Sequence, residues 1–176
     1  MTPLSLPGDS GPKAIAAYRA SLLALLGDAD PLDVLRAMPQ WCADIVEVTA
    51  EARLREPEGP GRWSVAEVLH HLADSEVVWS YRLRRTLAEE RPPLDGYDQD
   101  LWAARLGYGQ RAPAPSVAVF RVLRTANLAL VAQATEADLH RVGVHGERGE
   151  ESVAAMVRIY AGHDLAHRAQ IERILA

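Results

Sequence analysis

The sequence predicts an all-α protein, built as a four-helix bundle with a long crossover connection and an additional N-terminal helix. Apolar residues recur at the spacing of helical faces, whereas convincing alternating runs are missing and the chain contains one phenylalanine. Clusters of proline and glycine divide the chain into segments of helical length. Because no repeat or linker interrupts the 176 residues, we expect a single domain over residues 1–176, with a flexible N-terminus at residues 1–12.

The first third of the chain predicts three helical segments. A helix over residues 13–26 should end at Gly27, since glycine suits the conformation that follows a helix. A short helical piece is expected over residues 32–37. Pro39 fits the first turn of a further helix, where its missing N–H has no partner to lose. That helix should end before the loop at residues 57–61.

A strong helix start lies just after this loop. Ser64 and Glu67 match the capping box, in which both side chains pair with backbone N–H groups of the first turn. Trp63 can pack on Val68 as the accompanying hydrophobic staple. We therefore expect a long helix from this point to about Glu89, where a pair of prolines follows.

The second half of the chain predicts a crossover and two more long helices. Residues 94–115 form the crossover, with a short helix over residues 98–105. Ser116 should cap a helix that runs to about Thr135. The glycines at positions 143, 146 and 149 indicate a loop, and the last helix should begin near Ser152. Such a long connection is typical of bundles that are not simply up and down.

Charge and cysteine content exclude several classes of protein. A formal charge of −5 gives nucleic acid no general electrostatic reason to bind. Arg82, Arg84 and Arg85 form a small local basic patch, which we expect to be a solvated helix face. The N-terminus lacks the basic and apolar regions of a signal peptide, and no uninterrupted apolar run approaches membrane-spanning length. The single cysteine, Cys42, cannot form an internal disulfide, and we expect it to be buried and inert. We expect a cytoplasmic protein that binds neither nucleic acid nor membranes.

Three histidines are the main candidates for function. His163 and His167 are four residues apart on the last helix, so they lie within about 40° of each other, on its apolar face. His71 lies at the edge of the apolar stripe of its own helix. His70 points about 100° further outward and is expected to be solvated. His145, beside the glycine-rich loop, is expected to be exposed.

Burying imidazoles in an apolar bundle costs free energy unless their nitrogens are paired. One divalent metal ion (Zn, Ni, Fe or Mn) held by His71, His163 and His167 would pair them, and three protein ligands leave positions open for water or substrate. The alternative is that each histidine donates to a backbone carbonyl or a side chain and has no further role. The third histidine and the apolar setting favour the metal.

Three segments of the chain resemble the DinB/YfiT-like family of metalloenzymes. These are WSVAEVLHHLADSE at residues 63–76, DQDLW at residues 98–102 and GHDLAHRAQI at residues 162–171. The resemblance spans about Pro31 to the C-terminus. It implies a four-helix bundle whose metal is held by one histidine of the second bundle helix and two of the last, which match His71, His163 and His167.

The resemblance implies two kinds of chemistry on a small-molecule substrate. One is S-transfer, in which the metal ion activates the sulfur of a low-molecular-weight thiol such as bacillithiol or mycothiol. The other is hydrolysis by metal-activated water, with a carboxylate or histidine as general base. Because no carboxylate is placed beside the histidines, the sequence favours an S-transferase, with a metal-dependent hydrolase as the alternative.

A third possibility is a non-catalytic helical module for binding or dimerisation. The apolar side chains of Leu22, Leu25 and Leu26 can pack on a second copy, so a homodimer is expected.

Four further residues are candidates around the histidines. Tyr160 and Gln170 share the helical face of His163 and His167 and can line a pocket. Asp164 points about 100° away from His163, so it is expected to support the ligands from behind or to lie at the surface. Glu76 flanks the apolar stripe of its helix, and we expect it to make an interhelical or solvent contact.

Overall fold

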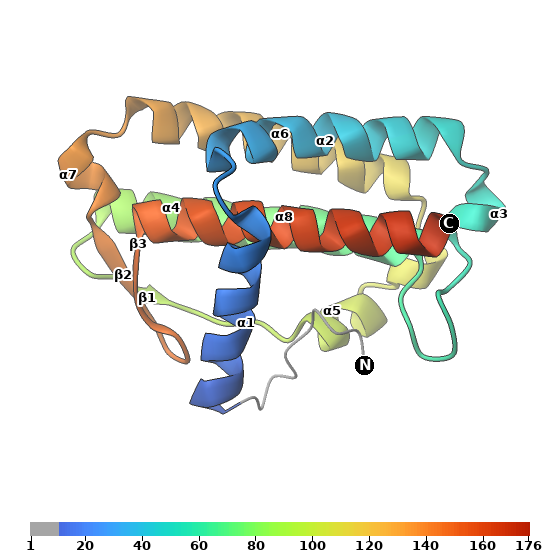
Figure 1. Ribbon diagram of the computed structural model, residues 1–176, viewed down its shortest axis with the longest axis horizontal. Helices are drawn as coiled ribbons and strands as arrows, with labels where there is room; N and C mark the ends of the chain where they lie inside the picture. Colours follow the sequence, from blue (N-terminus) through green and yellow to red (C-terminus); the bar gives the residue numbers. More distant parts are fainter. Residues whose placement is uncertain (1–10) are drawn as a thin grey trace.

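The computed structural model describes residues 11–176, and a bundle of four long helices dominates them (Figure 1). These helices are α2 (Pro31–Val48), α4 (Val65–Ala88), α6 (Pro113–Gln133) and α8 (Val153–Leu175). Both α2 and α4 pack against α6 and α8, so α2 and α4 occupy opposite corners of the bundle. The predicted bundle with its crossover and N-terminal helix is confirmed. The expected flexibility of residues 1–10 lies outside the described residues, and Pro12 already begins a helix.

Shorter elements connect and cover the bundle. They are α1 (Pro12–Leu26), α3 (Glu51–Leu54), the two-residue strand β1 (Pro93–Leu94), α5 (Gln99–Arg105), the 3-10 helix η1 (Tyr108–Gln110), α7 (Glu136–Leu139), β2 (Val142–His145) and β3 (Gly149–Ser152). The expected short helix of the crossover is α5. In Figure 1 the sheet lies at one end of the bundle, and α1 crosses α8 on its outer side.

The glycine-rich segment after α7 is a hairpin rather than the expected loop. β2 pairs antiparallel with β3, and β1 from the crossover pairs parallel with β2. Gly149 has a φ of 74°, which only glycine adopts without strain, and it begins β3. A Cβ at Gly143 would lie 2.6 Å from a methyl carbon of Leu94, so a glycine is what lets β1 lie against β2. These strands are too short to show the alternating pattern by which sequence reveals a sheet.

α2 is one helix, whereas the sequence predicted a break before Pro39. Proline cannot donate to the carbonyl four residues earlier, which leaves the carbonyl of Leu35 without its helical partner. The Arg124 guanidinium of α6 donates to that carbonyl through Nη1 at 3.0 Å. Because this contact from another helix satisfies the freed acceptor, α2 continues past Pro39 to Val48.

The start of α4 follows the prediction. The hydroxyl of Ser64 accepts from the backbone N–H of Glu67 at 3.3 Å, and the carboxylate of Glu67 accepts from the N–H of Ser64 at 2.8 Å. The complete capping box fixes where α4 begins, and therefore on which turn its later polar residues lie.

α6 begins three residues before the expected cap. Its N-cap is Ala112, and Pro113 occupies the first turn, for which the fixed φ of proline is suited. Ser116 therefore lies inside the helix. By length and composition alone, α6 is also apolar enough to cross a membrane, although Arg121 and Arg124 interrupt its apolar residues. Core helices of bundles pass the same test, and α6 packs on both α2 and α4.

The packing of α1 changes the interpretation of its leucines. Leu22 and Leu26 are buried against the bundle, and Leu25 alone among the three is exposed. A Cβ at Gly162 of α8 would lie 2.3 Å from the carbonyl oxygen of Leu22, so this glycine permits the close approach of α1 to α8. The surface expected to form a homodimer is thus mostly internal, and dimerisation stays a prediction.

Within residues 11–176, two apolar clusters form the core, one toward each end of the bundle. One gathers around Leu69, Phe120 and Ile171, and the other around Trp79 and Val157. The helices place polar side chains between them, and this middle layer contains the candidate site.

Candidate metal centre

Three histidines converge in the middle layer from two helices. His71 belongs to α4, and His163 and His167 lie one turn apart on α8. The Nε2 atom of His163 lies 3.1 Å from Nε2 of His71 and 3.1 Å from Nε2 of His167. One nitrogen of each ring lies within 4.8 Å of the others. The predicted trio is therefore brought together by packing of α4 against α8.

This convergence is not explained by hydrogen bonding among the rings. A neutral imidazole carries one N–H, so Nε2 of His163 can donate to only one of its two neighbours. Protonation is disfavoured because burial lowers the pKa of all three histidines, reinforced for His71 and His163 by the neighbouring imidazoles. The pKa of His167 falls to about 4. Near neutral pH the cluster presents neutral nitrogens, the form that binds metal ions.

A neighbouring amide fixes the ring of His167. The Nδ1–H of His167 donates to Oε1 of Gln170 at 2.9 Å, which leaves the lone pair on Nε2, directed at His163. Gln170 itself is buried and does not line the cavity described below.

The ring of His71 packs against Trp63, with ring centroids 5.1 Å apart. His71 Nδ1 has no hydrogen-bond partner within residues 11–176.

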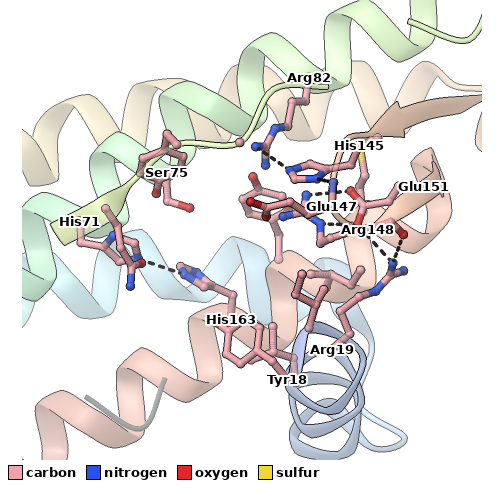
Figure 2. A pocket seen from close by; sticks show the side chains of 18 residues that line it. Tyr18, Arg19, His71, Ser75, Arg82, His145, Glu147, Arg148, Glu151 and His163 are labelled. Atoms are coloured by element: carbon pink, nitrogen blue, oxygen red, sulfur yellow. Dashed lines mark hydrogen bonds and ion pairs between the residues drawn. The ribbon is translucent and has the colours of Figure 1, made fainter. Parts of the chain in front are cut away.

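A cavity of about 170 Å³ reaches the histidines from the side of α1, the crossover and the β2–β3 hairpin (Figure 2). His71 and His163 line its inner end, and His163 is partly exposed. Exposed Gly96 and Glu147 line it at the other end, so the cavity opens to the surface. Tyr97, just before α5, and Gln99, the first residue of α5, form part of its wall. A small molecule can therefore reach two of the three imidazoles.

Tyr160 and Asp164 were both candidates from the sequence, and only Tyr160 lines the cavity. Tyr160 lines the cavity and stacks on Trp79, with ring centroids 4.8 Å apart. Asp164 is buried on the far side of α8, where its carboxylate accepts from Arg124 at 2.5 Å. The same guanidinium donates to Glu76 at 2.8 Å, which is the interhelical contact expected for Glu76. Neither carboxylate lines the cavity.

Two histidines predicted to face solvent are buried instead. His70 lies beside the hydroxyl of Ser116 at 2.7 Å and the carbonyl of Arg111 at 3.2 Å, because the crossover covers this face of α4. His145 is 2% exposed and lines the cavity, 3.3 Å from an Nη2 nitrogen of Arg82. The sequence had no signal for His145, since its burial depends on the hairpin packing against α4.

Arg82 is another cavity residue that sequence reasoning missed. It follows His71 by eleven residues on α4, a spacing that returns to within about 20° of the same helical face. The sequence suggested a solvated basic patch with Arg84 and Arg85, whereas Arg82 is buried and lines the cavity. The spacing of eleven residues, which puts Arg82 on the same helical face as His71, was the sequence signal that could have identified it as a cavity residue.

Comparisons with known proteins agree with this architecture. The model of the DinB superfamily matches residues 14–171. "Putative metal-dependent hydrolase YfiT" of Bacillus subtilis is 28% identical over 146 residues, covering 81% of this chain and 82% of that protein. "Putative metal-dependent hydrolase GK0616" of Geobacillus kaustophilus is 30% identical over 138 residues, covering 78% of each chain.

A solved structure supports the same relationship. YfiT from Bacillus subtilis, described as "a probable metal-dependent hydrolase with an unusual four-helix bundle topology", superposes with a TM-score of 0.77 and 25% sequence identity. The match covers 97% of this chain and 91% of that chain. These relatives carry hydrolase names, and none of these names supports the S-transferase that the sequence favoured.

Proposed function

Since this chain belongs to the DinB superfamily, we propose that it is a metal-dependent hydrolase whose metal ion is held by His71, His163 and His167. The observation that supports this most directly is the convergence of three imidazole nitrogens at the inner end of an open cavity. The hydrolase names of the relatives favour hydrolysis over thiol transfer.

The donor set fits a divalent ion. Metal–nitrogen bonds of about 2.0–2.1 Å put two adjacent imidazole nitrogens on one ion about 2.8–3.4 Å apart, from octahedral to tetrahedral geometry. The two Nε2–Nε2 distances from His163, each 3.1 Å, fall in this range, and the donor nitrogens of His71 and His167 lie within 4.8 Å of each other. Zinc, nickel, iron and manganese all accept imidazole ligands, and three protein ligands leave positions for water and substrate.

When bound, such an ion acts as a Lewis acid and makes water a nucleophile near neutral pH. The residues around it hold the ligands in place. Gln170 keeps the lone pair of His167 on Nε2, and Trp63 restricts the ring of His71. The ion pair of Asp164 with Arg124 holds the turn of α8 that carries His163. The Asp164 carboxylate is engaged in this pair.

The first test is metal content. Untagged protein should contain about one divalent ion per chain by inductively coupled plasma mass spectrometry. The variants His71→Ala, His163→Ala and His167→Ala should lose the ion. His140→Ala removes an exposed histidine outside the cluster and serves as the matched control. Absence of metal from wild type, even after incubation with zinc, nickel, manganese and ferrous iron, would contradict the proposal and favour a non-catalytic module.

The second test identifies the reaction. Metal-loaded protein is assayed against chromogenic esters, amides and phosphoesters, and separately with a low-molecular-weight thiol and an electrophile. Hydrolysis that disappears in His163→Ala and persists in His140→Ala supports the hydrolase. Thiol adduct formation with the same dependence, and no hydrolysis, would replace it with the S-transferase.

A further inference from the structure

Arg82 occupies the end of the cavity opposite the histidines. Arg82 is eleven positions after His71 on α4, which corresponds to about 16 Å along the helix axis. In Figure 2 the Arg82 side chain lies beside His145 at one end of the cavity, and His71 and His163 lie at the other. Ser75 lies between them on the same face of α4. A ligand in this cavity would contact both ends.

The contacts of Arg82 leave its charge uncompensated. The guanidinium donates through Nη2 to the carbonyl oxygen of Asp95 and lies 3.3 Å from Nε2 of His145. Within residues 11–176 no carboxylate lies within 4.0 Å of it, and its Nε has no hydrogen-bond partner. Arg82 is 5% exposed, so water compensates this charge poorly. A buried charge without a counter-ion is costly.

Two other arginines of the chain, the buried Arg124 and the half-buried Arg148, show the usual solution. Arg124 is 2% exposed and pairs with both Glu76 and Asp164. Arg148, another cavity residue, pairs with Glu151 through two hydrogen bonds of 2.7 and 2.9 Å. Among the described residues that line the cavity, Arg82 is thus the deeply buried cation without an acidic partner.

The cavity as a whole also favours an anion. Three arginines and two glutamates line it, a formal charge of +1, although the whole chain has a formal charge of −5. Glu151 is already shared by Arg148 and, at 3.5 Å, by Arg19. Counting the side chains alone, without the proposed metal ion, one unit of positive charge remains to be neutralised, which matches a monoanion at the Arg82 end.

We propose that Arg82 binds a carboxylate of the substrate, so that the substrate is an elongated carboxylic acid with the reacting bond at its other end. The Nη1 and Nη2 nitrogens of the guanidinium can present the paired N–H groups from which a carboxylate accepts in bidentate fashion. The position of the reacting bond rests on the proposed hydrolase function. Binding of the carboxylate by Arg82 does not, because it needs no metal ion.

Equilibrium binding tests this assignment independently of activity. Linear carboxylates from acetate to octanoate, and the neutral amide and alkyl phosphate of each length, are titrated calorimetrically into the purified protein. The titrations are repeated after removal of metal with a chelator, since a carboxylate also binds metal ions. We expect carboxylates to bind about tenfold more tightly than amides or phosphates in both preparations. Tighter binding of the phosphates would overturn the assignment to a monoanion.

Arg82→Met isolates the guanidinium, and Arg158→Met removes an exposed arginine of α8 outside the cavity. We expect Arg82→Met to lose the preference for carboxylates and Arg158→Met to retain it. The melting temperature of Arg82→Met should equal or exceed that of wild type, because an unpaired buried charge is removed. Unchanged carboxylate binding, or a marked drop in the melting temperature, would show that Arg82 is structural.

The two proposals can fail separately. Arg82-dependent binding in protein that holds no metal would retain the carboxylate subsite and reject the hydrolase. The opposite outcome is metal-dependent hydrolysis in which replacing Arg82 has no effect on substrate binding. If wild type and Arg82→Met have the same KM for an acid substrate, and also the same KM for its methyl ester, the hydrolase is retained and the carboxylate subsite is rejected.

Discussion

At the scale of single residues, two buried arginines of this bundle differ in what neutralises them. Arg124 lies between Glu76 and Asp164 and also satisfies the carbonyl that Pro39 leaves free in α2. Arg82 has backbone and imidazole neighbours instead of carboxylates. Burial is similar, so the difference in partners predicts different roles. Arg124 stabilises the fold, whereas Arg82 is available to a ligand.

Replacing Arg124 therefore has a large predicted cost. Arg124→Met would leave the carboxylates of Glu76 and Asp164 buried without a counter-ion, which destabilises a protein by about 3–5 kcal/mol. Urea denaturation followed by circular dichroism measures the change. Arg158→Met should stay within about 0.5 kcal/mol of wild type. Similar unfolding curves for the two variants would show that the network contributes little to stability.

His145 predicts a pH dependence of stability. Burial, followed by the charges of Arg148 and Arg82, lowers its pKa to about 4, against opposing effects of Glu151 and Asp95. Between pH 6.5 and about 4 the unfolded state therefore binds a proton that the folded state does not, so stability falls as the pH falls through this window.

A variant isolates this contribution from that of the other histidines. In His145→Gln the titrating group is absent, so the difference in free energy of unfolding between wild type and variant should move against wild type from pH 7 to pH 4. Urea denaturation at four or five pH values gives this difference. A difference independent of pH would mean that His145 titrates normally in the folded protein.

At the scale of elements, the position of His163 depends on a contact between two helices. Gly162 precedes it on α8, at the point where the backbone of α1 comes close. α1 also supplies Tyr18, Arg19 and Leu22 to the cavity wall. The approach of α1 to α8 therefore shapes the cavity as well as the core.

Gly162→Ala tests this contact. The added Cβ would lie 2.3 Å from the backbone oxygen of Leu22, so α1 must move. We expect a loss of about 1–3 kcal/mol, typical of overpacking, and weaker metal binding as His163 shifts with its helix. Gly59→Ala is the control, since its Cβ would meet nothing closer than 3.9 Å. Equal melting temperatures for Gly162→Ala and Gly59→Ala would contradict the close packing.

At the scale of the whole molecule, two apolar clusters flank the polar layer that holds the histidines. These clusters, rather than a metal ion, supply the burial that stabilises a chain of this size. Metal should therefore modulate stability without being required for folding.

Chelation and reconstitution test this expectation. Chelator-treated wild type should keep its far-ultraviolet circular dichroism spectrum and melt cooperatively. Zinc added at about one hundred times its Kd should stabilise it by about 2.7 kcal/mol, seen as a higher melting temperature. The triple variant His71→Ala, His163→Ala, His167→Ala should be folded and should not respond to zinc. Loss of helical signal on chelation would instead make the metal structural.

The sequence was sufficient wherever the signal is local. The capping box of Ser64 and Glu67 predicted where α4 begins, because its hydrogen bonds join residues three apart. That His71, His163 and His167 face the core was predictable from helical phase, since a helix fixes the direction of each side chain from its position in the sequence. That they share one metal site was implied by the resemblance to the DinB/YfiT-like family, and packing of α4 against α8 brings them together.

Contacts between distant residues were decided only by the tertiary structure. The continuation of α2 through Pro39 depends on a donor from Arg124, 89 positions from Leu35 in the sequence. The burial of His145 depends on Arg82, 63 positions away, and on a hairpin too short to have a recognisable pattern. The sequence by itself thus determined the helices and the three histidines, through local geometry. The cavity, and the arginine it leaves without a counter-ion, were decided by packing, because the partners of a buried charge come from whichever elements the fold brings beside it.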